Sequence, residues 1–166
     1  MTLVRALENT LSAETVTAGS DAASATGFSA EPMSVLAPAS ADEVAEIMKW
    51  ASREAVGVLP FCGGSRLPAV PEDHPYVAVS TSRLSGVEIY EAADLTVTAG
   101  AGTPSTTVDR VLRENRQWTP FNPPRVEDRS LGGLVALGES GSLWMGYGEL
   151  RNHVLGMTVV TGDGRV

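Results

Sequence analysis

The sequence predicts an α+β fold in two lobes, and three features of the chain carry that prediction. Residues 34–61 have the apolar pattern of a strand, a helix and a second strand. Residues 87–99 alternate apolar and polar side chains, which is typical of half-buried strands. Two glycine-rich segments, residues 61–67 and 130–136, lie far apart in the chain. We expect each lobe to present one of these segments to a single elongated ligand, although either segment alone is compatible with an ordinary turn.

The composition limits the class of protein. A chain of 166 residues with 43% hydrophobic residues is long enough for one domain or two small lobes. The net charge of −8 leaves no basic stripe for nucleic acid. No run approaches the roughly 18 apolar residues of a membrane span, and the acidic N-terminus lacks the apolar core of a signal peptide. The single cysteine excludes an internal disulfide and a cysteine-based zinc site, so we expect a cytoplasmic protein without a bound metal.

The first lobe is expected over residues 34–86, after a lead-in over residues 1–33. The lead-in contains a short helix, predicted by three leucines at helical spacing: Leu3, Leu7 and Leu11. The rest of the lead-in, residues 13–31, is rich in small and polar residues and is expected to be irregular. A short strand over residues 34–38 then opens the lobe.

A helix follows this strand. Ser40 and Glu43 have the spacing of a capping box, in which each side chain accepts from the other residue's backbone N–H. The apolar face of the helix is predicted from four residues: Val44, Ile47, Met48 and Ala51. Residues 58–61 are predicted to form a buried strand that completes a right-handed crossover, and residues 76–80 form the next strand.

The second lobe is expected over residues 87–166. After two strands, Thr103 is predicted to cap a helix with Pro104 at its first position and with three inward side chains: Val108, Val111 and Leu112. Residues 121–124 are expected to be extended or turned, and residues 150–155 to form a short helix or turn. Residues 157–161 are predicted to form a final strand, followed by a hairpin-like turn at residues 162–164. Because no returning strand follows that turn, we expect an open sheet edge that needs a partner.

Several spaced motifs occur in one order. They are Gly63-Gly64-Ser65, residues 94–100, Ser130-Leu131-Gly132-Gly133, Tyr147-Gly148, Arg151, residues 154–156 and Gly162-Asp163-Gly164. In these motifs the chain, over residues 34–166, resembles the FAD-binding domain of the vanillyl-alcohol oxidase / p-cresol methylhydroxylase (PCMH) superfamily, and most of all the glycolate oxidase FAD-binding subunit and related FAD-linked oxidases. The resemblance implies a two-lobed PCMH-type fold, with a small βαβ lobe and a second lobe that has a mixed or antiparallel sheet and flanking helices.

By this resemblance, the first glycine segment wraps the pyrophosphate of FAD. Its residues are Phe61, Cys62, Gly63, Gly64, Ser65, Arg66 and Leu67. Backbone amides without side chains can form a concave anion site, to which the Ser65 hydroxyl and the Arg66 charge can add.

The second glycine segment is implied to pass near the isoalloxazine and ribityl parts of FAD. This group of residues is Ser130, Leu131, Gly132, Gly133, Ala136, Ser140 and Gly141. The resemblance adds Gly148 and Val154 to the site, and Pro123 and Pro124 as stiffeners of the approach.

The chain departs from the family pattern at three points. Cys62 stands where the family usually has a third glycine, so this position must tolerate a Cβ or the loop is altered. Ser65 stands where members that bind flavin covalently carry histidine, so noncovalent FAD is expected. Family members also continue into a substrate-binding cap beyond the point where this chain ends, so we expect a partner subunit or a second copy to complete the sheet and the active site.

Other chemistry-bearing residues have two interpretations. His74 is predicted to be a surface residue, whereas His153 lies beside the flavin segments in the sequence. Cys62 is either a reactive thiol or a small residue chosen for space, and Arg151 contacts a flavin phosphate or forms a structural salt bridge. Three aromatic residues can stack on a ring or pack in the core: Trp118, Trp144 and Tyr147.

No carboxylate pair or Ser/His/Asp set is present that indicates catalysis by side chains alone. No catalytic residue is therefore assigned, and the flavin is expected to carry the chemistry. The resemblance implies an FAD-binding domain or subunit of a flavin-dependent oxidoreductase acting on a 2-hydroxy acid such as glycolate. The alternative is a non-catalytic binding or assembly module, or a truncated remnant of such an oxidase.

Overall fold

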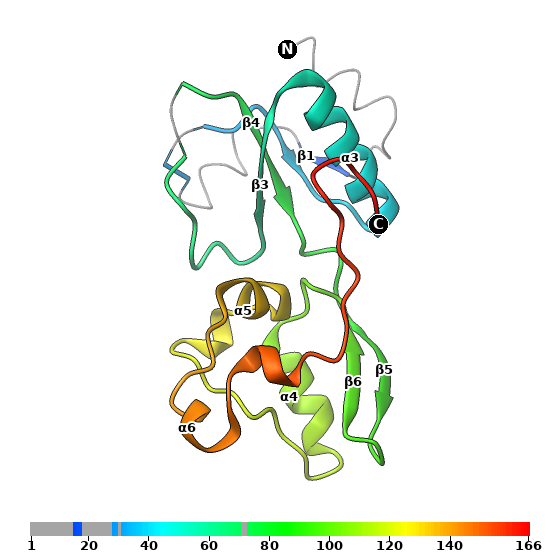
Figure 1. Cartoon of the computed structure of the whole chain (residues 1–166), viewed down its shortest axis with the longest axis vertical. Helices are drawn as coiled ribbons and strands as arrows, with labels where there is room; N and C mark the ends of the chain where they lie inside the picture. The colour runs from blue at the N-terminus through cyan, green and yellow to red at the C-terminus, as the bar shows by residue number, and fades with distance from the viewer. Residues whose placement is uncertain (1–14, 18–27, 30, 71–72) are drawn as a thin grey trace. The chain divides into compact units, whose positions relative to one another are not determined.

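The computed structural model describes residues 15–17, 28–29, 31–70 and 73–166 (Figure 1). The chain divides into two compact units. The first consists of Met1–Arg83 with Thr158–Val166, and the second of Leu84–Met157. The helix predicted around Leu3, Leu7 and Leu11 lies outside the described residues.

The first unit contains a four-stranded sheet. Its strands are β1 (Val16–Thr17), β2 (Val35–Leu36), β3 (Gly57–Phe61) and β4 (Tyr76–Ser80), in the spatial order β1-β2-β4-β3. β1 pairs antiparallel with β2, whereas β2 and β3 both run parallel to β4. β1 lies in a stretch that the sequence predicts to be irregular, and its pairing with β2 makes it a strand. All five residues of β4 are buried, as expected for a strand flanked on both sides in a parallel arrangement.

Helix α3 (Ala41–Glu54) connects β2 to β3. The predicted cap is half correct. The Ser40 Oγ accepts from the Glu43 N–H at 3.2 Å. The Glu43 carboxylate does not return to Ser40; it accepts from the Ala39 N–H at 2.8 Å and from the Thr15 hydroxyl at 3.1 Å. The bond from the Thr15 hydroxyl joins the start of α3 to the residue that precedes β1.

The buried face of α3 differs in part from the predicted one. Ile47 and Ala51 are buried as expected, but Ala45 and Trp50 join them, while Val44 and Met48 are only half-buried. Figure 1 shows α3 running alongside β3 and β4. Three of its buried residues, Ile47, Trp50 and Ala51, belong to a cluster with six others: Met33, Leu36, Val56, Val58, Val77 and Val79.

Strand β3 is an edge strand in this sheet, not the buried strand that the sequence predicts. Only Leu59 of β3 is buried, because among the described strands β3 has a neighbour on one side alone. Pro60, which lacks an N–H, is tolerated at such an edge. The opposite face of the sheet packs Leu59 with Tyr76 and Ala78, and the Phe28 ring lies edge-on to Phe61 at 5.2 Å.

The C-terminal segment returns to α3. Residues 157–161 form no strand, contrary to expectation, but the predicted turn is present, with the Thr161 N–H donating to the Arg165 carbonyl at 2.9 Å. Gly164 is buried with φ +76°, and a Cβ there would lie 2.6 Å from the Ala45 carbonyl oxygen. The turn therefore contacts α3 at backbone distance, which only glycine permits.

The second unit opens with a two-stranded antiparallel sheet, β5 (Val87–Glu91) and β6 (Thr96–Ala99), as predicted. Helix α4 (Ser105–Arg113) buries Val108 and Leu112, while Val111 is half-buried. Thr103 is not its N-cap, because Pro104 occupies that position. The buried Thr103 hydroxyl instead accepts from the Gly86 N–H at 2.9 Å and donates to the Gly86 carbonyl at 3.2 Å.

The remainder of this unit consists of short helices. They are the 3-10 helix η1 (Val126–Asp128), α5 (Leu131–Leu137), α6 (Trp144–Tyr147) and the 3-10 helix η2 (Leu150–His153). η2 confirms the short helix or turn predicted near residue 150. Phe121, Leu134 and Leu150 form the small core that joins α5 to η2. Among the described residues, no helix is both long enough and apolar enough to cross a membrane.

Candidate functional site

The first glycine segment leaves the end of β3 as irregular chain. The Phe61 carbonyl accepts from the Thr81 N–H at 2.8 Å, which fixes the start of the segment to the residue after β4. Gly64 has φ +67°, a conformation that side-chain-bearing residues rarely adopt. Four of its residues, Phe61, Cys62, Gly64 and Leu67, are partly buried, whereas Gly63, Ser65 and Arg66 are exposed.

The second glycine segment is a helix and not the loop that the sequence predicts. Ser130 is the N-cap of α5, and its Oγ accepts from the Gly133 N–H at 3.3 Å. Leu131, Gly132 and Gly133 form the first turn, and Ala136 is an exposed residue of the last. The serine cap stabilises the first turn and so offsets the low helix propensity of the two glycines.

Gly132 is required by contacts within the second unit. A Cβ there would lie 2.9 Å from both the Cβ and the carbonyl oxygen of Ala101. The Gly132 N–H donates to that carbonyl at 2.7 Å, and the Leu131 N–H donates to the Thr103 carbonyl at 2.9 Å. The start of α5 is therefore held directly against the loop before α4.

The end of α5 leads into a second tight approach. Gly138 ends the helix with φ +64°, and Gly141 follows with φ +74°. A Cβ on Gly141 would lie 2.2 Å from the Asn122 carbonyl oxygen. The Asn122 N–H donates to the Ser140 carbonyl at 3.0 Å, and the Asn122 Oδ1 accepts from the Leu143 N–H at 3.0 Å. The segment before Pro123 therefore fixes the path of residues 140–143.

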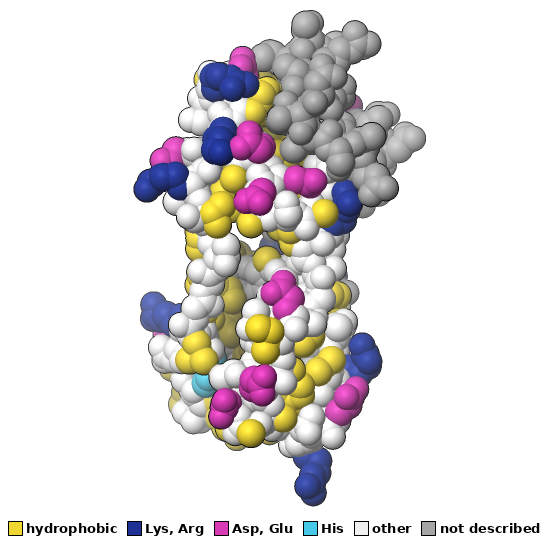
Figure 2. Space-filling view, turned by 90° about the vertical axis from the view of Figure 1, so that its right-hand side faces the viewer, with side chains coloured by type: hydrophobic (Ala, Val, Ile, Leu, Met, Phe, Trp, Pro, Cys, Tyr) yellow, Lys and Arg dark blue, Asp and Glu magenta, His cyan; other side chains and the backbone are white. Residues whose placement is uncertain are grey.

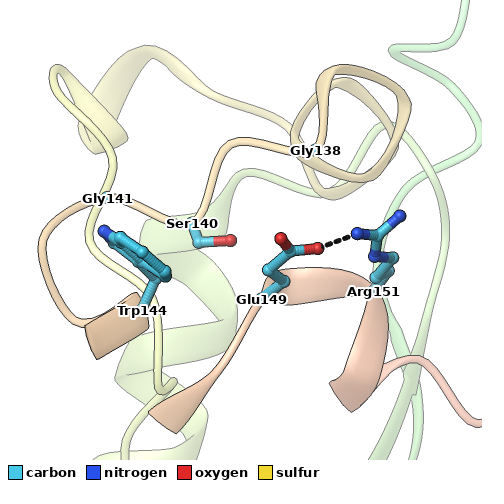
Figure 3. Close-up of a pocket in the computed structure, with 6 residues that line it drawn as sticks. All are labelled: Gly138, Ser140, Gly141, Trp144, Glu149 and Arg151. Carbon is cyan, nitrogen blue, oxygen red and sulfur yellow. Dashed lines mark ion pairs between the residues drawn. The ribbon is translucent and has the colours of Figure 1, made fainter. Parts of the chain in front are cut away.

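A pocket of about 470 Å³ lies at this end of α5 (Figure 3). It is lined by Gly138, Ser140, Gly141, Trp144, Glu149 and Arg151. The Ser140 Oγ accepts from the Leu150 N–H at 2.8 Å, which joins the pocket wall to η2. Glu149 and Arg151 form an ion pair across the pocket rim. The lining thus offers two glycines without side chains, one indole ring and a paired set of charges.

Two of the predicted site residues, Ser140 and Gly141, line this pocket. The other predicted residues of the second unit do not: Pro123, Pro124, Ser130, Leu131, Gly132, Gly133, Ala136, Gly148 and Val154. Of these, Gly148 precedes the lining residue Glu149 and has φ +86°, and Val154 ends η2. Gly138 and Glu149 are not among the residues predicted from the sequence, although a glycine directly after an apolar helical run is a usual signal of a helix end.

The three aromatic residues with two interpretations lie at the surface, so core packing was the wrong alternative for them. Trp118, Trp144 and Tyr147 are each about half exposed, and Trp118 lies edge-on to Tyr147 at 5.1 Å. Figure 2 shows one face of the molecule on which hydrophobic side chains reach the surface between acidic ones.

The two histidines lie at the surface. His74 is exposed as predicted, and its Nδ1 lies 3.2 Å from a carboxylate oxygen of Asp73, a hydrogen bond that lowers the pKa of Asp73. The Nε2 of His153 is 2.9 Å from the Tyr147 carbonyl, which can only accept, so this nitrogen carries the proton. Arg151 forms the structural salt bridge, one of its two predicted uses.

Known proteins resemble this chain in sequence. The D-2-hydroxyglutarate dehydrogenase of Xanthomonas citri pv. viticola is 33% identical over 137 residues, which make up 81% of this chain and 29% of that protein. The glycolate oxidase subunit GlcE of Escherichia coli is 36% identical over 81 residues, 48% of this chain and 23% of that protein. The chain thus spans less than a third of the length of either relative.

The fold also occurs among solved structures. The grass pollen allergen Phl p 4, which has glucose dehydrogenase activity, superimposes with a TM-score of 0.81 at 17% identity, over 98% of this chain and 37% of the allergen. This similarity shows that the α+β fold expected from the sequence is correct. The model of the FAD binding domain family matches residues 32–166. The chain therefore belongs to the FAD binding domain family of FAD-linked oxidoreductases, and FAD is its cofactor.

Proposed function

We propose that the chain holds FAD without a covalent bond and that both glycine segments contribute to its binding. The first glycine segment binds the pyrophosphate, and the second unit holds the isoalloxazine and ribityl parts near the pocket at the end of α5. In this proposal the lobes span residues 34–86 and 87–166.

The observation that carries this proposal is the pocket itself. Its volume of about 470 Å³ lies in the range of small-molecule sites. Nothing lies within 4 Å of a Cβ on Gly138, so at this lining residue a flat ring can lie against backbone. Trp144 is 52% exposed and can stack on such a ring, and the Glu149–Arg151 pair offers polar groups for its edge. The residues present therefore fit the group.

The first glycine segment suits the phosphates for a separate reason. Gly63 and Ser65 are exposed on either side of Gly64, whose positive φ turns the backbone. Consecutive amides around such a residue form a concave anion site, and the Ser65 hydroxyl and the Arg66 guanidinium add hydrogen-bond donors.

We propose further that the complete enzyme oxidises a 2-hydroxy acid, of which glycolate is one example. The relatives named above include a D-2-hydroxyglutarate dehydrogenase and a glycolate oxidase subunit. FAD, when bound, accepts the electrons of that oxidation. The residues of this chain bind and orient the cofactor, and a second polypeptide or a second copy supplies the groups that bind the substrate. One of the two relatives is itself a subunit, which supports this division of roles.

Titration of FAD with the Gly64→Val variant tests the first segment. The added side chain disfavours the positive φ and fills the anion site, so we expect FAD affinity to fall by about a hundredfold or more. Gly162→Val is the matched control in the same unit, because nothing lies within 4 Å of a Cβ at that position. A folded Gly64→Val variant with the affinity of the wild type would contradict the assignment.

Acid precipitation tests the noncovalent bond. We expect all of the flavin to remain in the supernatant. Flavin that precipitates with the protein would contradict the proposal and would point first to Cys62, the single thiol of the chain.

A further inference from the structure

The ion pair between Arg129 and Glu139 differs from the other ion pairs of the second unit. The Nη2 of Arg129 lies 2.5 Å from a carboxylate oxygen of Glu139, and the two side chains are 5% and 21% exposed. The arginines of the Arg113–Asp109 and Arg151–Glu149 pairs are 73% and 78% exposed. Exposed pairs contribute little, whereas a buried charge depends on its partner.

The position of this pair in the fold is specific. Arg129 directly precedes Ser130, the N-cap of α5, and Glu139 directly follows Gly138, its C-cap. The pair therefore joins the two ends of a seven-residue helix, about 10 Å long. The Arg129 end is anchored, since its N–H donates to the Val126 carbonyl at 3.1 Å and its carbonyl accepts from the Ser105 N–H at 2.9 Å.

The other end of the pair reaches the pocket. Glu139 stands between Gly138 and Ser140, and both neighbours line the pocket. Local backbone preference holds this stretch weakly, because α5 is short and contains Gly132 and Gly133 in its first turn. At the end of α5, nothing lies within 4 Å of the position that a Cβ on Gly138 would occupy. The bonds that Asn122 and Leu150 donate hold the Ser140 end of the wall, and the Arg129–Glu139 pair adds a contact at the residue next to Gly138.

We infer that Arg129 and Glu139 form a positioning pair that holds the Gly138–Ser140 wall in place for the flavin; this rests on the proposed function. Neither side chain lines the pocket, so the pair acts through the backbone of its neighbours. The buried Arg129 Nε has no hydrogen-bond partner among the described residues, so the guanidinium depends on Glu139.

Two variants separate positioning from simple stability. Glu139→Gln removes one charge and leaves the buried guanidinium uncompensated, which lowers stability. Arg129→Met combined with Glu139→Met removes both charges and retains side-chain volume, so stability returns toward that of the wild type. The double variant still lacks the directional link between the ends of α5. Asp109→Asn is the control, because it breaks an exposed pair on α4.

Three quantities are measured for each variant: the urea midpoint of unfolding, the affinity for FAD, and the hydrogen-exchange rates of the Asn122 and Leu150 amides without flavin. Both amides donate to Ser140, at 3.0 and 2.8 Å, and so report on the wall. We expect the double variant to unfold near the wild-type midpoint, to bind FAD about tenfold or more weakly, and to exchange both amides faster. Asp109→Asn is expected to change none of the three.

A double variant with wild-type FAD affinity and wild-type exchange rates would overturn the inference and leave the pair a stabilising contact only. If the wild-type chain itself binds no FAD, the proposed function fails. The exchange rates then still decide whether the pair holds the wall.

Discussion

Gly138 and Gly141 both adopt positive φ at the pocket wall, but their surroundings differ. Nothing lies within 4 Å of a Cβ on Gly138, whereas a Cβ on Gly141 would lie 2.2 Å from the Asn122 carbonyl oxygen. Gly138→Ala is expected to cost about 1 kcal/mol of unfolding free energy from backbone strain alone. Gly141→Ala is expected to cost about 2 kcal/mol more, because the backbones must separate. Urea unfolding measures both, and equal losses would contradict the close approach.

Burial makes Tyr76 sensitive to high pH. Desolvation raises the pKa of its hydroxyl above the ordinary value of 10.0. The folded state thus favours the neutral form. This contribution to stability is fully present below the unfolded pKa and is lost as pH rises through the folded pKa. We expect the free energy of unfolding to fall more steeply above about pH 10 in the wild type than in Tyr76→Phe.

Urea midpoints measured from neutral pH upward test this prediction. Tyr147→Phe is the matched control, since Tyr147 is 51% exposed. Parallel pH profiles for the wild type and Tyr76→Phe would contradict the role of burial.

The effect of a glycine-to-alanine change on stability is expected to differ between the two glycines in the first turn of helix α5. Gly132→Ala places a Cβ 2.9 Å from the Ala101 backbone, whereas at Gly133 the nearest atom is the Ser130 Oγ at 3.2 Å. A hydroxyl can move more easily than backbone, and alanine favours helix by about 1 kcal/mol over glycine. Gly132→Ala is therefore expected to destabilise the chain by about 1–3 kcal/mol, and Gly133→Ala by less. Thermal unfolding compares them, and the reverse order would contradict the contact between α5 and the Ala101 loop.

The elements show what the sequence can predict. Strand β4, the β5–β6 pair and helix α4 follow from local periodicity. The same periodicity could not show that β3 lies at a sheet edge, because strand order depends on long-range pairing. The Gly132-Gly133 pair reads locally as a loop, yet the Ser130 cap and the contact with Ala101 make it a helix. Thr103 has the local pattern of an N-cap, but its hydroxyl bonds Gly86, 17 residues earlier.

The candidate site was predictable to a similar degree. Ser140 and Gly141 follow from a motif, and both residues line the pocket, while their contact with FAD stays a prediction. Gly138 carries only the general signal of a helix end and Glu149 carries no motif, so the fold is needed to show that both line the pocket. The Arg129–Glu139 pair spans ten residues without a recognisable pattern, so only the fold reveals it.

In the whole enzyme, we expect cofactor binding and substrate binding to reside in different parts. The purified chain loaded with FAD is expected to show negligible turnover of 2-hydroxy acids with a dye acceptor, because no groups that bind substrate or exclude water are assigned to it. The same assay over a panel including glycolate and D-2-hydroxyglutarate measures this. Ordinary turnover by a monomer of this chain would contradict the need for a second polypeptide or copy.

The most direct test of the central claim is a titration of the purified chain with FAD, followed by flavin fluorescence and by the visible absorption bands. We predict saturable binding of one FAD per chain, with a change in Trp144 emission that is absent in Trp144→Leu. A chain that is folded by circular dichroism and leaves the flavin spectrum and fluorescence unchanged at saturating concentrations would contradict it.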